Sequence, residues 1–190
     1  MEKNYIEDKS FEKTDFTLNP LEKAEYENCS FLNCDFSNSD LSGIHFSDCE
    51  FTGCNLSMAN IHKTAFRDII FKGSKLLGLH FETCDDFVIS MNFDNCILNF
   101  SSFYTVKLKK TTFKDCSIQE VDFTEADLSK SIFNHCDLNK TKFDRTTLEG
   151  VDFSTSYNYS LDPEINRIKK AKFSLGGIQG LLDKYDIEIE

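Results

Sequence analysis

A large apolar residue recurs at every fifth position along most of this chain. The repeat runs in step from Phe11 to Phe81, resumes at Val88 after an interval of seven residues instead of five, and continues to Phe153. A period of five matches neither the 3.6 residues per turn of a helix nor the two-residue alternation of a strand. Strict short repeats indicate one structural unit that is stacked many times. This feature therefore restricts the fold more than any other property of the chain.

The position two residues before each apolar residue is also regular, because it carries mostly small side chains. Burying two positions in every five requires a bend in each unit, so the chain must coil around its own axis. Successive coils then pair in parallel, about 4.8 Å apart, which predicts an all-β solenoid whose repeats contact only their neighbours. Residues twenty apart are of like kind, which indicates four units per coil; Phe11, Phe31, Phe51 and Phe71 form one such column, and Phe93, Phe113, Phe133, Phe153 and Phe173 form another.

Individual units share a recognisable pattern of a small residue, a polar residue, Leu or Phe, and two further polar residues. Examples are CDFSN (34–38), SDLSG (39–43) and CDLNK (136–140). This pattern resembles the pentapeptide-repeat family over about residues 9–173. The resemblance implies a right-handed quadrilateral parallel β-helix, here in two blocks, 9–81 and 86–173, separated by a register slip at 82–87. Residues 1–8 lack the repeat, and we expect an irregular N-terminal segment there.

All eight cysteines occupy the small position of the unit, namely Cys29, Cys34, Cys49, Cys54, Cys84, Cys96, Cys116 and Cys136. We interpret them as small buried residues that fill the core. Disulfides, metal ligation and catalysis are the alternatives. Stacking at about 4.8 Å exceeds the Cβ spacing of roughly 3.5–4.5 Å that a disulfide needs, so we expect free thiols.

The slip at 82–87 contains two residues more than the repeat requires. One interpretation is a bulge at a corner of the coil. The other is a small protrusion that a partner could bind, formed by Thr83, Asp85 and Asp86, because loops on rigid scaffolds often carry function.

The C-terminal segment, residues 174–190, is expected to form a short helix and a terminal strand. Ser174 is a candidate helix cap, and Ile187 and Ile189 alternate with acidic residues as in an edge strand. The segment either caps the last coil or also pairs with its twin in a homodimer, the commonest oligomer. The apolar residues at helical spacing that would do so are Leu175, Ile178, Leu181, Leu182 and Tyr185.

The formal net charge of −11 argues against nucleic-acid binding. The sequence shows neither a signal peptide nor an apolar run long enough for a membrane span, so we expect a cytoplasmic protein without membrane contact. Residues 24–62 contain no Lys or Arg, and their acidic side chains are a candidate surface for a basic partner or a merely solvated surface; they are Glu25, Glu27, Asp35, Asp40, Asp48 and Glu50. Residues 87–190 carry sixteen acidic and thirteen basic residues, a far weaker bias.

The tail NYSLDPEINRIKKAKFSLGGIQGLLDKYDIEIE (158–190) and the run ENCSFLNCDFSNSDLSG (27–43) are similar to those of gyrase-protecting members, the quinolone- and albicidin-resistance proteins. This resemblance implies a DNA-mimicking protein that dimerises through its C-terminal end, binds DNA gyrase or topoisomerase IV and relieves inhibition by quinolones or peptide toxins. The alternative is a rigid scaffold for another protein partner. No phosphate-binding loop, nucleophile elbow or HExxH motif is present, so we expect no enzymatic activity, cofactor or metal site. A phenylalanine-filled interior is also expected to leave no pocket.

Overall fold

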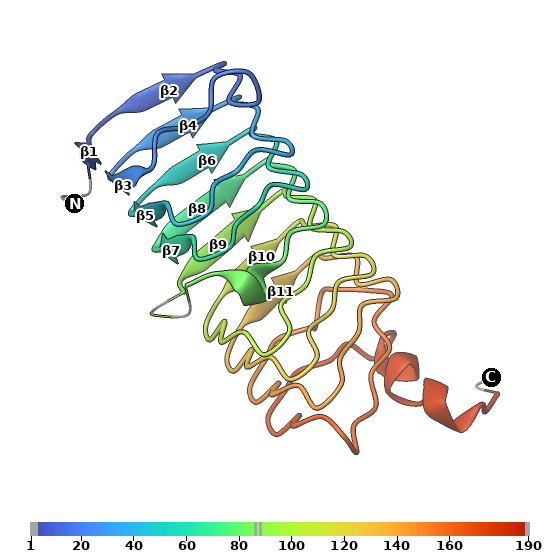
Figure 1. The fold of residues 1–190 in the computed structure, drawn as a ribbon. Coiled ribbons are helices and arrows are strands. Elements are labelled where there is room, and N and C mark those ends of the chain that lie inside the picture. Colours follow the sequence, from blue (N-terminus) through green and yellow to red (C-terminus); the bar gives the residue numbers. More distant parts are fainter. Residues whose placement is uncertain (1–3, 86, 88, 189–190) are drawn as a thin grey trace.

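The computed structural model describes residues 4–85, 87 and 89–188, and it is a parallel β-helix with four faces (Figure 1). Face 1 carries a 4-stranded sheet of β1 (Asn4–Glu7), β3 (Ala24–Glu27), β5 (His45–Ser47) and β7 (Ala65–Arg67). Face 2 carries a 7-stranded sheet of β2 (Ser10–Glu12), β4 (Ser30–Leu32), β6 (Glu50–Thr52), β8 (Ile69–Lys72), β9 (Met91–Asp94), β10 (Thr112–Lys114) and β11 (Ile132–Asn134). The expected solenoid is therefore confirmed.

Single parallel bridges continue the ladders where the strands are too short to be regular. On face 3 they connect residues 15, 35, 55 and 75 and then 97, 117, 137 and 157. On face 4 they connect 40 with 60, and 80 with 102, 122 and 142. Beyond the slip, face 1 continues as a bridge ladder through residues 107, 127, 147 and 167. Each coil thus visits all four faces before the next coil begins.

The phenylalanines stack in register, as their spacing predicts. Phe31 lies over Phe51 with ring centroids 4.7 Å apart and planes within 8°. The ladder also crosses the slip, because β8 and β9 pair Phe71 with Phe93, and these rings are 5.4 Å apart. The two expected face 2 columns are consequently one, running from Phe11 to Phe173. The slip lengthens one coil without interrupting this side of the core.

The last residue of most units adopts a left-handed conformation, and this is how the chain turns each corner. Asn28, Asn33 and Asn38 have φ of 50°, 52° and 56°, and Gly43 and Gly53 have φ of 70° and 64°. Asn, Asp and Gly tolerate this region better than other residues. The polar residues between the apolar positions therefore set the bend that makes the coil close.

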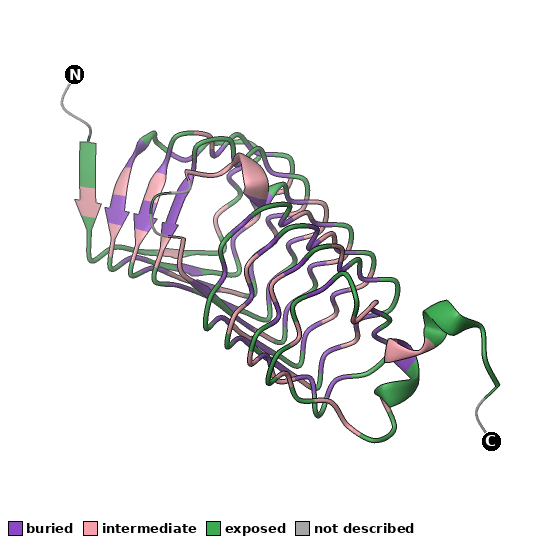
Figure 2. Ribbon diagram, turned by 90° about the horizontal axis from the view of Figure 1, so that it is seen from below, coloured by how far each residue is buried: buried purple, intermediate pink, exposed green. Residues whose placement is uncertain are grey.

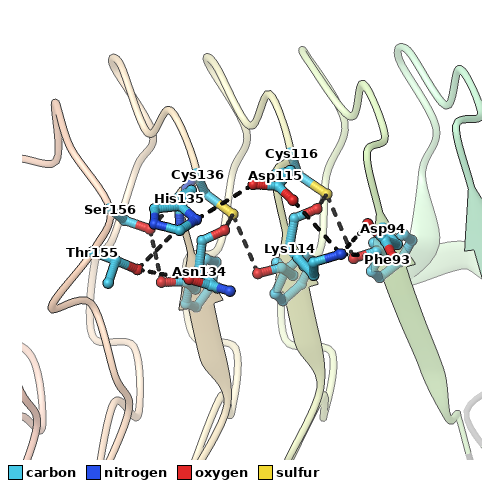
Figure 3. Close-up of polar contacts among 12 residues, drawn as sticks. Phe93, Asp94, Lys114, Asp115, Cys116, Asn134, His135, Cys136, Thr155 and Ser156 are labelled. Atoms are coloured by element: carbon cyan, nitrogen blue, oxygen red, sulfur yellow. Dashed lines mark hydrogen bonds and ion pairs between the residues drawn. The ribbon is translucent and has the colours of Figure 1, made fainter.

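The small buried side chains also satisfy backbone groups. Ser131 Oγ donates a hydrogen bond of 2.8 Å to the carbonyl of Leu108, and the Sγ atoms of Cys116 and Cys136 lie 3.6 and 3.4 Å from the carbonyls of Phe93 and Phe113 (Figure 3). Buried carbonyls need such partners. The small position is thus a donor position as well as a packing position, which explains why Ser, Thr and Cys share it.

Replacing Ser131 by Ala should test this role. The hydroxyl donates to Leu108 and accepts from the amide of Thr111 at 3.1 Å, and both partners are buried. Leaving them unsatisfied should lower the free energy of unfolding by about 1–3 kcal/mol, measured by urea denaturation. Ser131→Cys, which keeps a donor of the kind found elsewhere in the column, should lose less; an equal loss would mean that the hydrogen bonds are not the cause.

All eight cysteines are free, as predicted, and all but Cys84 are fully buried. Burial raises the pKa of the Cys49 and Cys54 thiols to about 12. A thiol that stays protonated is a poor nucleophile and metal ligand. The chemistry of these two side chains therefore agrees with the packing interpretation.

Both ends of the rod differ from expectation. The N-terminal segment was expected to be irregular, but Asn4–Glu7 forms β1, which pairs with β3 in register. The cause is the open edge of the first coil, whose backbone groups pair with any extended neighbour. Residues 1–3 lie outside the described residues.

The expected C-terminal helix is wrong in type. Two short 3-10 turns, η2 (Ile178–Leu181) and η3 (Asp183–Tyr185), replace it. The Ser174 hydroxyl does accept the amide of Gly177 at 2.9 Å, but three glycines in so short a segment disfavour an α-helix. The expected terminal strand is absent at 186–188, and 189–190 lie outside the described residues.

In Figure 2 buried and exposed residues alternate along the coils, and the C-terminal segment is mostly exposed. In the part of the chain that is described, no helix is long and apolar enough to cross a membrane.

Candidate functional site

The six acidic residues singled out from the sequence do not gather on one surface. Because a coil passes all four faces within about twenty residues, a run of this length encircles the rod. Glu25 and Glu27 lie on face 1, and Asp48 lies at the corner between faces 1 and 2. Glu50 lies on face 2, Asp35 on face 3 and Asp40 on face 4.

Cations from adjacent coils neutralise part of this run. Lys72 Nζ lies 2.7 Å from Glu50, and hydrogen bonds from Lys72 and Thr52 lower the pKa of that carboxyl. Lys23 Nζ lies 3.0 Å from Asp40, and hydrogen bonds from Ser42 and Lys23 lower the pKa of Asp40 to about 2. These lysines lie outside the lysine-free run in sequence. Adding or subtracting twenty residues, one coil, would have pointed to the region of each partner.

On face 1 two of the acidic side chains contact Tyr5 and His45. Glu27 accepts a hydrogen bond from the hydroxyl of Tyr5, which raises the pKa of that phenol to about 12. Glu25 lies 3.6 Å from the His45 ring. Within the described residues, Asp48 has no ion pair. Three of the six acidic residues, Glu25, Glu27 and Asp48, thus lie on face 1 or at its corner, more than on any other face.

The formal charge of face 1 changes from negative to positive at the slip. In its first half, residues 4–8, 24–28, 44–48 and 64–68, six acidic residues accompany one arginine, a formal charge of −5. In its second half, residues 106–110, 126–130, 146–150 and 166–170, seven basic residues accompany two acidic ones, a formal charge of +5. The overall charge of −11 hides this contrast. The sequence did show the weaker acidic bias after residue 87 but not that its cations share a face.

The slip segment lies closer to the coil than a protrusion would. The Thr83 hydroxyl donates 2.8 Å to the carbonyl of His80, and Asp85 lies 4.0 Å from Arg67, so both candidate residues are half-buried. Asp86 lies outside the described residues. The exposed side chain is Phe87, at 72 %, with the Arg67 guanidinium 6.0 Å from its ring centroid. Phe87 was not singled out from the sequence, because it lies between Phe81 and Val88, the apolar positions of two successive repeat units.

A cavity of about 540 Å³ opens beside this segment, contrary to the expectation that the interior leaves no pocket. The slip removes a regular strand from face 1 and leaves this space; its lining is Phe81, Glu82, Cys84, Ile89, Thr105, Val106, Lys107 and Lys109. Elsewhere, within the described residues, no group of three or more His, Cys, Asp or Glu side chains is placed to hold a metal ion.

The C-terminal segment divides its apolar residues between the coil and solvent. Leu181 packs against the core and Leu182 is half-buried. Leu175, Ile178 and Tyr185 are 91 %, 48 % and 50 % exposed. The expected single apolar face is therefore not formed, because 3-10 turns do not place these residues on one side.

Comparisons with known proteins agree with this architecture. The pentapeptide repeat region family matches residues 19–85 and 88–157. No curated protein matches the sequence. Among solved structures, a trypsin-treated variant of QnrB1, a plasmid-mediated fluoroquinolone resistance protein, aligns with a TM-score of 0.63 at 19% identity over 100% of both chains.

Two further structures of the same relative align similarly. A second trypsin-treated variant of QnrB1 has a TM-score of 0.63 at 20% identity, covering 98% of this chain and 100% of that chain. Full-length QnrB1 has a TM-score of 0.55 at 20% identity, covering 97% and 100%. At this identity the likeness establishes the fold. With the family match over most of its length, the chain belongs to the pentapeptide-repeat family and is Qnr-like in structure.

Proposed function

We propose that this chain is a non-enzymatic binding protein that occupies the DNA-binding surface of DNA gyrase or topoisomerase IV and protects the enzyme from inhibitors such as quinolones or peptide toxins. Its fold is that of a fluoroquinolone resistance protein. The observation that carries the proposal is the formal charge of −5 on the first half of face 1 of a rigid rod. A fixed row of carboxylates on a rod presents charge as a DNA backbone does, and a basic groove selects for it.

The charge distribution limits where the enzyme would bind. The first half of face 1 has a formal charge of −5, and the second half has +5. A basic enzyme surface therefore favours the N-terminal half of the rod. Contact centred on the C-terminal half would place like charges together, which costs binding energy.

A supercoiling assay tests this placement. Purified protein should counter inhibition of gyrase by a quinolone, and Glu7→Lys/Glu27→Lys on face 1 should raise the concentration needed by about tenfold or more, since each lost charge contact costs a fraction of the binding energy. Asp15→Lys/Asp35→Lys changes the charge equally on face 3 and should have little effect. No protection by the unaltered protein, in assays with both enzymes, would overturn the proposal.

We also propose that two copies associate through their C-terminal ends. Leu175 and Ile178 are exposed in the C-terminal segment, and Ile165 on the last coil is 49 % exposed. Exposed apolar residues of this kind are typical of interfaces.

Leu175→Asp should then halve the mass measured by light scattering, because the side chain is 91 % exposed and its replacement disturbs no intramolecular packing. Leu18→Asp, at a 76 % exposed position near the other end, is the matched control and should leave the mass unchanged. A monomeric unaltered protein, or a dimer insensitive to Leu175→Asp, would mean that the segment only caps the last coil.

The second half of face 1 favours one alternative, a rigid scaffold for a different protein partner. Seven basic residues there are not what a DNA mimic needs. If the purified protein leaves both topoisomerases unaffected, this alternative becomes the better description.

A further inference from the structure

Along one edge of the rod, the acidic residues of the N-terminal half and the lysines of the C-terminal half lie at matching distances from the slip. In the four coils before the slip coil and the four after it, the corner between faces 1 and 2 is formed by a residue with φ between 50° and 69°, so these positions are equivalent. Before the slip the corner residues are Asp8, Asn28, Asp48 and Asp68, and after it they are Lys110, Lys130, Gly150 and Lys170. We name these eight residues the charged edge.

When the residues of the charged edge are matched from its two ends inward, each acidic residue corresponds to a lysine and the neutral residue corresponds to the other neutral residue. Asp8 corresponds to Lys170, Asp48 to Lys130 and Asp68 to Lys110. The neutral Asn28 corresponds to the neutral Gly150. A second copy turned end for end, by a two-fold axis crossing the rod near the slip, places every acidic corner opposite a lysine.

The backbone geometry makes this correspondence physical. Corner amides bind the coil that follows in the same way in both halves: Asp48 N donates to the Arg67 carbonyl at 2.9 Å, and Lys130 N donates to the Glu149 carbonyl at 2.9 Å. Successive corners in both halves are therefore separated by one ladder spacing, about 4.8 Å. Two such edges running in opposite directions match along their length, whereas a partner with another spacing matches at one or two points only.

The side chains of the charged edge are available for such pairing. All are exposed except Gly150, which is half-buried. Among the described residues, the Asp8 and Asp68 carboxylates contact neutral groups, accepting hydrogen bonds from Asn28 Nδ2 at 2.5 Å and Ser90 Oγ at 2.9 Å. Within the described residues, none of the three lysines forms an ion pair.

On other faces many cations are paired across coils. Lys114 lies 3.1 Å from Asp94, as Figure 3 shows, Lys142 lies 3.7 Å from Asp122, and Lys172 lies 3.0 Å from Asp152. Arg145 lies 3.1 Å from Glu125. Such pairing is what a stacked lattice gives when opposite charges follow each other along a column. The charged edge departs from it by grouping like charges in each half.

We propose that the charged edge is a self-association surface on which a second copy of this chain binds side by side and antiparallel. This contact does not involve the C-terminal end, but it shares Asp8, Asp48 and Asp68 with the acidic half of face 1, so self-association competes with the proposed topoisomerase binding. Three acid–lysine pairs form, each twice by symmetry. Duplex DNA is the competing partner for the lysines, but the net charge of −11 and the aspartates of the same edge oppose it.

The neighbouring column on face 1 restricts the contact to the edge itself. There the same rotation brings Glu7 to Lys169 and Ser47 to Ser129, but it also brings Glu27 to Glu149. The rods therefore touch along their corners rather than with flat faces. Exposed ion pairs are individually weak and screened by salt, so the association should be weak and salt-sensitive.

Sedimentation velocity of the full chain, measured at ionic strengths of about 0.05 M and about 1 M, tests the proposal. At the higher ionic strength the screening length is only roughly 3 Å, so exposed ion pairs are largely screened. The measured mass should be twice as large at low salt as at high salt. This holds whether the protein at high salt is a monomer or a dimer joined through its C-terminal ends. Asp8→Lys/Asp48→Lys and Lys130→Glu/Lys170→Glu should each abolish the doubling. Both pairs are conservative for the backbone, since Lys13, Lys63, Glu120 and Glu125 already occupy corners with φ of 50°, 57°, 55° and 59°.

The decisive experiment mixes Asp8→Lys/Asp48→Lys with Lys130→Glu/Lys170→Glu. In a dimer of one copy of each variant, every acidic corner again lies opposite a lysine on both sides of the two-fold axis. The mixed sample should regain the doubled mass that neither variant has alone. Lys63→Glu/Lys140→Glu, which makes the same charge change at exposed corners of other edges, should behave like the unaltered protein. A mass independent of salt, a mixture that stays unassociated, or loss of association in this control would each overturn the proposal.

Two further measurements test register and partner. Asn28→Cys mixed with Gly150→Cys should give a disulfide-linked heterodimer at low salt, and neither variant alone should crosslink. Absence of the heterodimer would refute the antiparallel register. If a fluorescent DNA duplex binds the unaltered protein, and Lys130→Glu/Lys170→Glu removes that binding while self-association is absent, the edge is a phosphate-binding surface instead.

Discussion

Phe123→Ala should destabilise the protein by about 3–5 kcal/mol, the cost of deleting a fully buried ring. The Phe123 ring is stacked between Phe103 at 5.1 Å and Phe143 at 5.6 Å, and its edges meet Phe113 and Phe133, both at 6.1 Å. Coils on both sides hold the backbone at fixed spacing, so the site cannot collapse to fill the cavity. Urea denaturation followed by circular dichroism measures the loss.

Lys75→Ala is the control for this substitution. Lys75 lies exposed on face 3 between Asn55 and Ile97 of the bridge ladder, and surface replacements of this kind stay within about 0.5 kcal/mol. Comparable losses at the two positions would mean that the inward and outward positions are wrongly assigned.

Gly180→Ala should detach the C-terminal segment from the last coil. A Cβ at this position would lie 1.9 Å from the carbonyl oxygen of Tyr159, which is backbone and cannot rotate away. The Leu161 amide, which donates 2.9 Å to the Gly180 carbonyl, would lose its partner. Overpacking of this kind costs about 1–3 kcal/mol. We expect a lower melting temperature and loss of hydrogen-exchange protection at Leu161.

Gly176→Ala provides the matched comparison, because a Cβ there meets nothing within 4 Å. It should leave both the melting temperature and the protection of Leu161 nearly unchanged. Equal effects of the two substitutions would show that the flexibility of the segment, rather than its close approach to Tyr159, determines docking.

Much of the interior could be predicted from the sequence. The beat of five located the buried positions, the twenty-residue recurrence of Phe gave the stacking partners, and the shared position of the cysteines gave free thiols. These predictions succeeded because each depends on one short unit and its nearest neighbours, which is all that a solenoid contacts. The donor role of the small position was missed, since a carbonyl in need of a partner leaves no mark on the sequence.

The ends were harder to predict because they lack such neighbours. Residues 4–7 pair only because the first coil leaves an open edge beside them. The C-terminal apolar residues have helical spacing, but Gly177 and Gly180 are there to allow close approach to Tyr159 and not to end a helix. In both cases the deciding contact comes from a coil that the local sequence does not identify.

The sequence by itself determined the repeat, the buried columns and the total charge, because each of these is periodic or additive along the chain. Only the tertiary structure decided which charges act together. Coiling sends a continuous acidic run around all four faces, while it collects Asp8, Asp48 and Asp68 and then Lys110, Lys130 and Lys170 on one edge. The reason is that charges on this rod are neighbours when they lie one coil apart on the same face, so residues adjacent in the sequence are sent to different faces while residues about twenty apart are brought together.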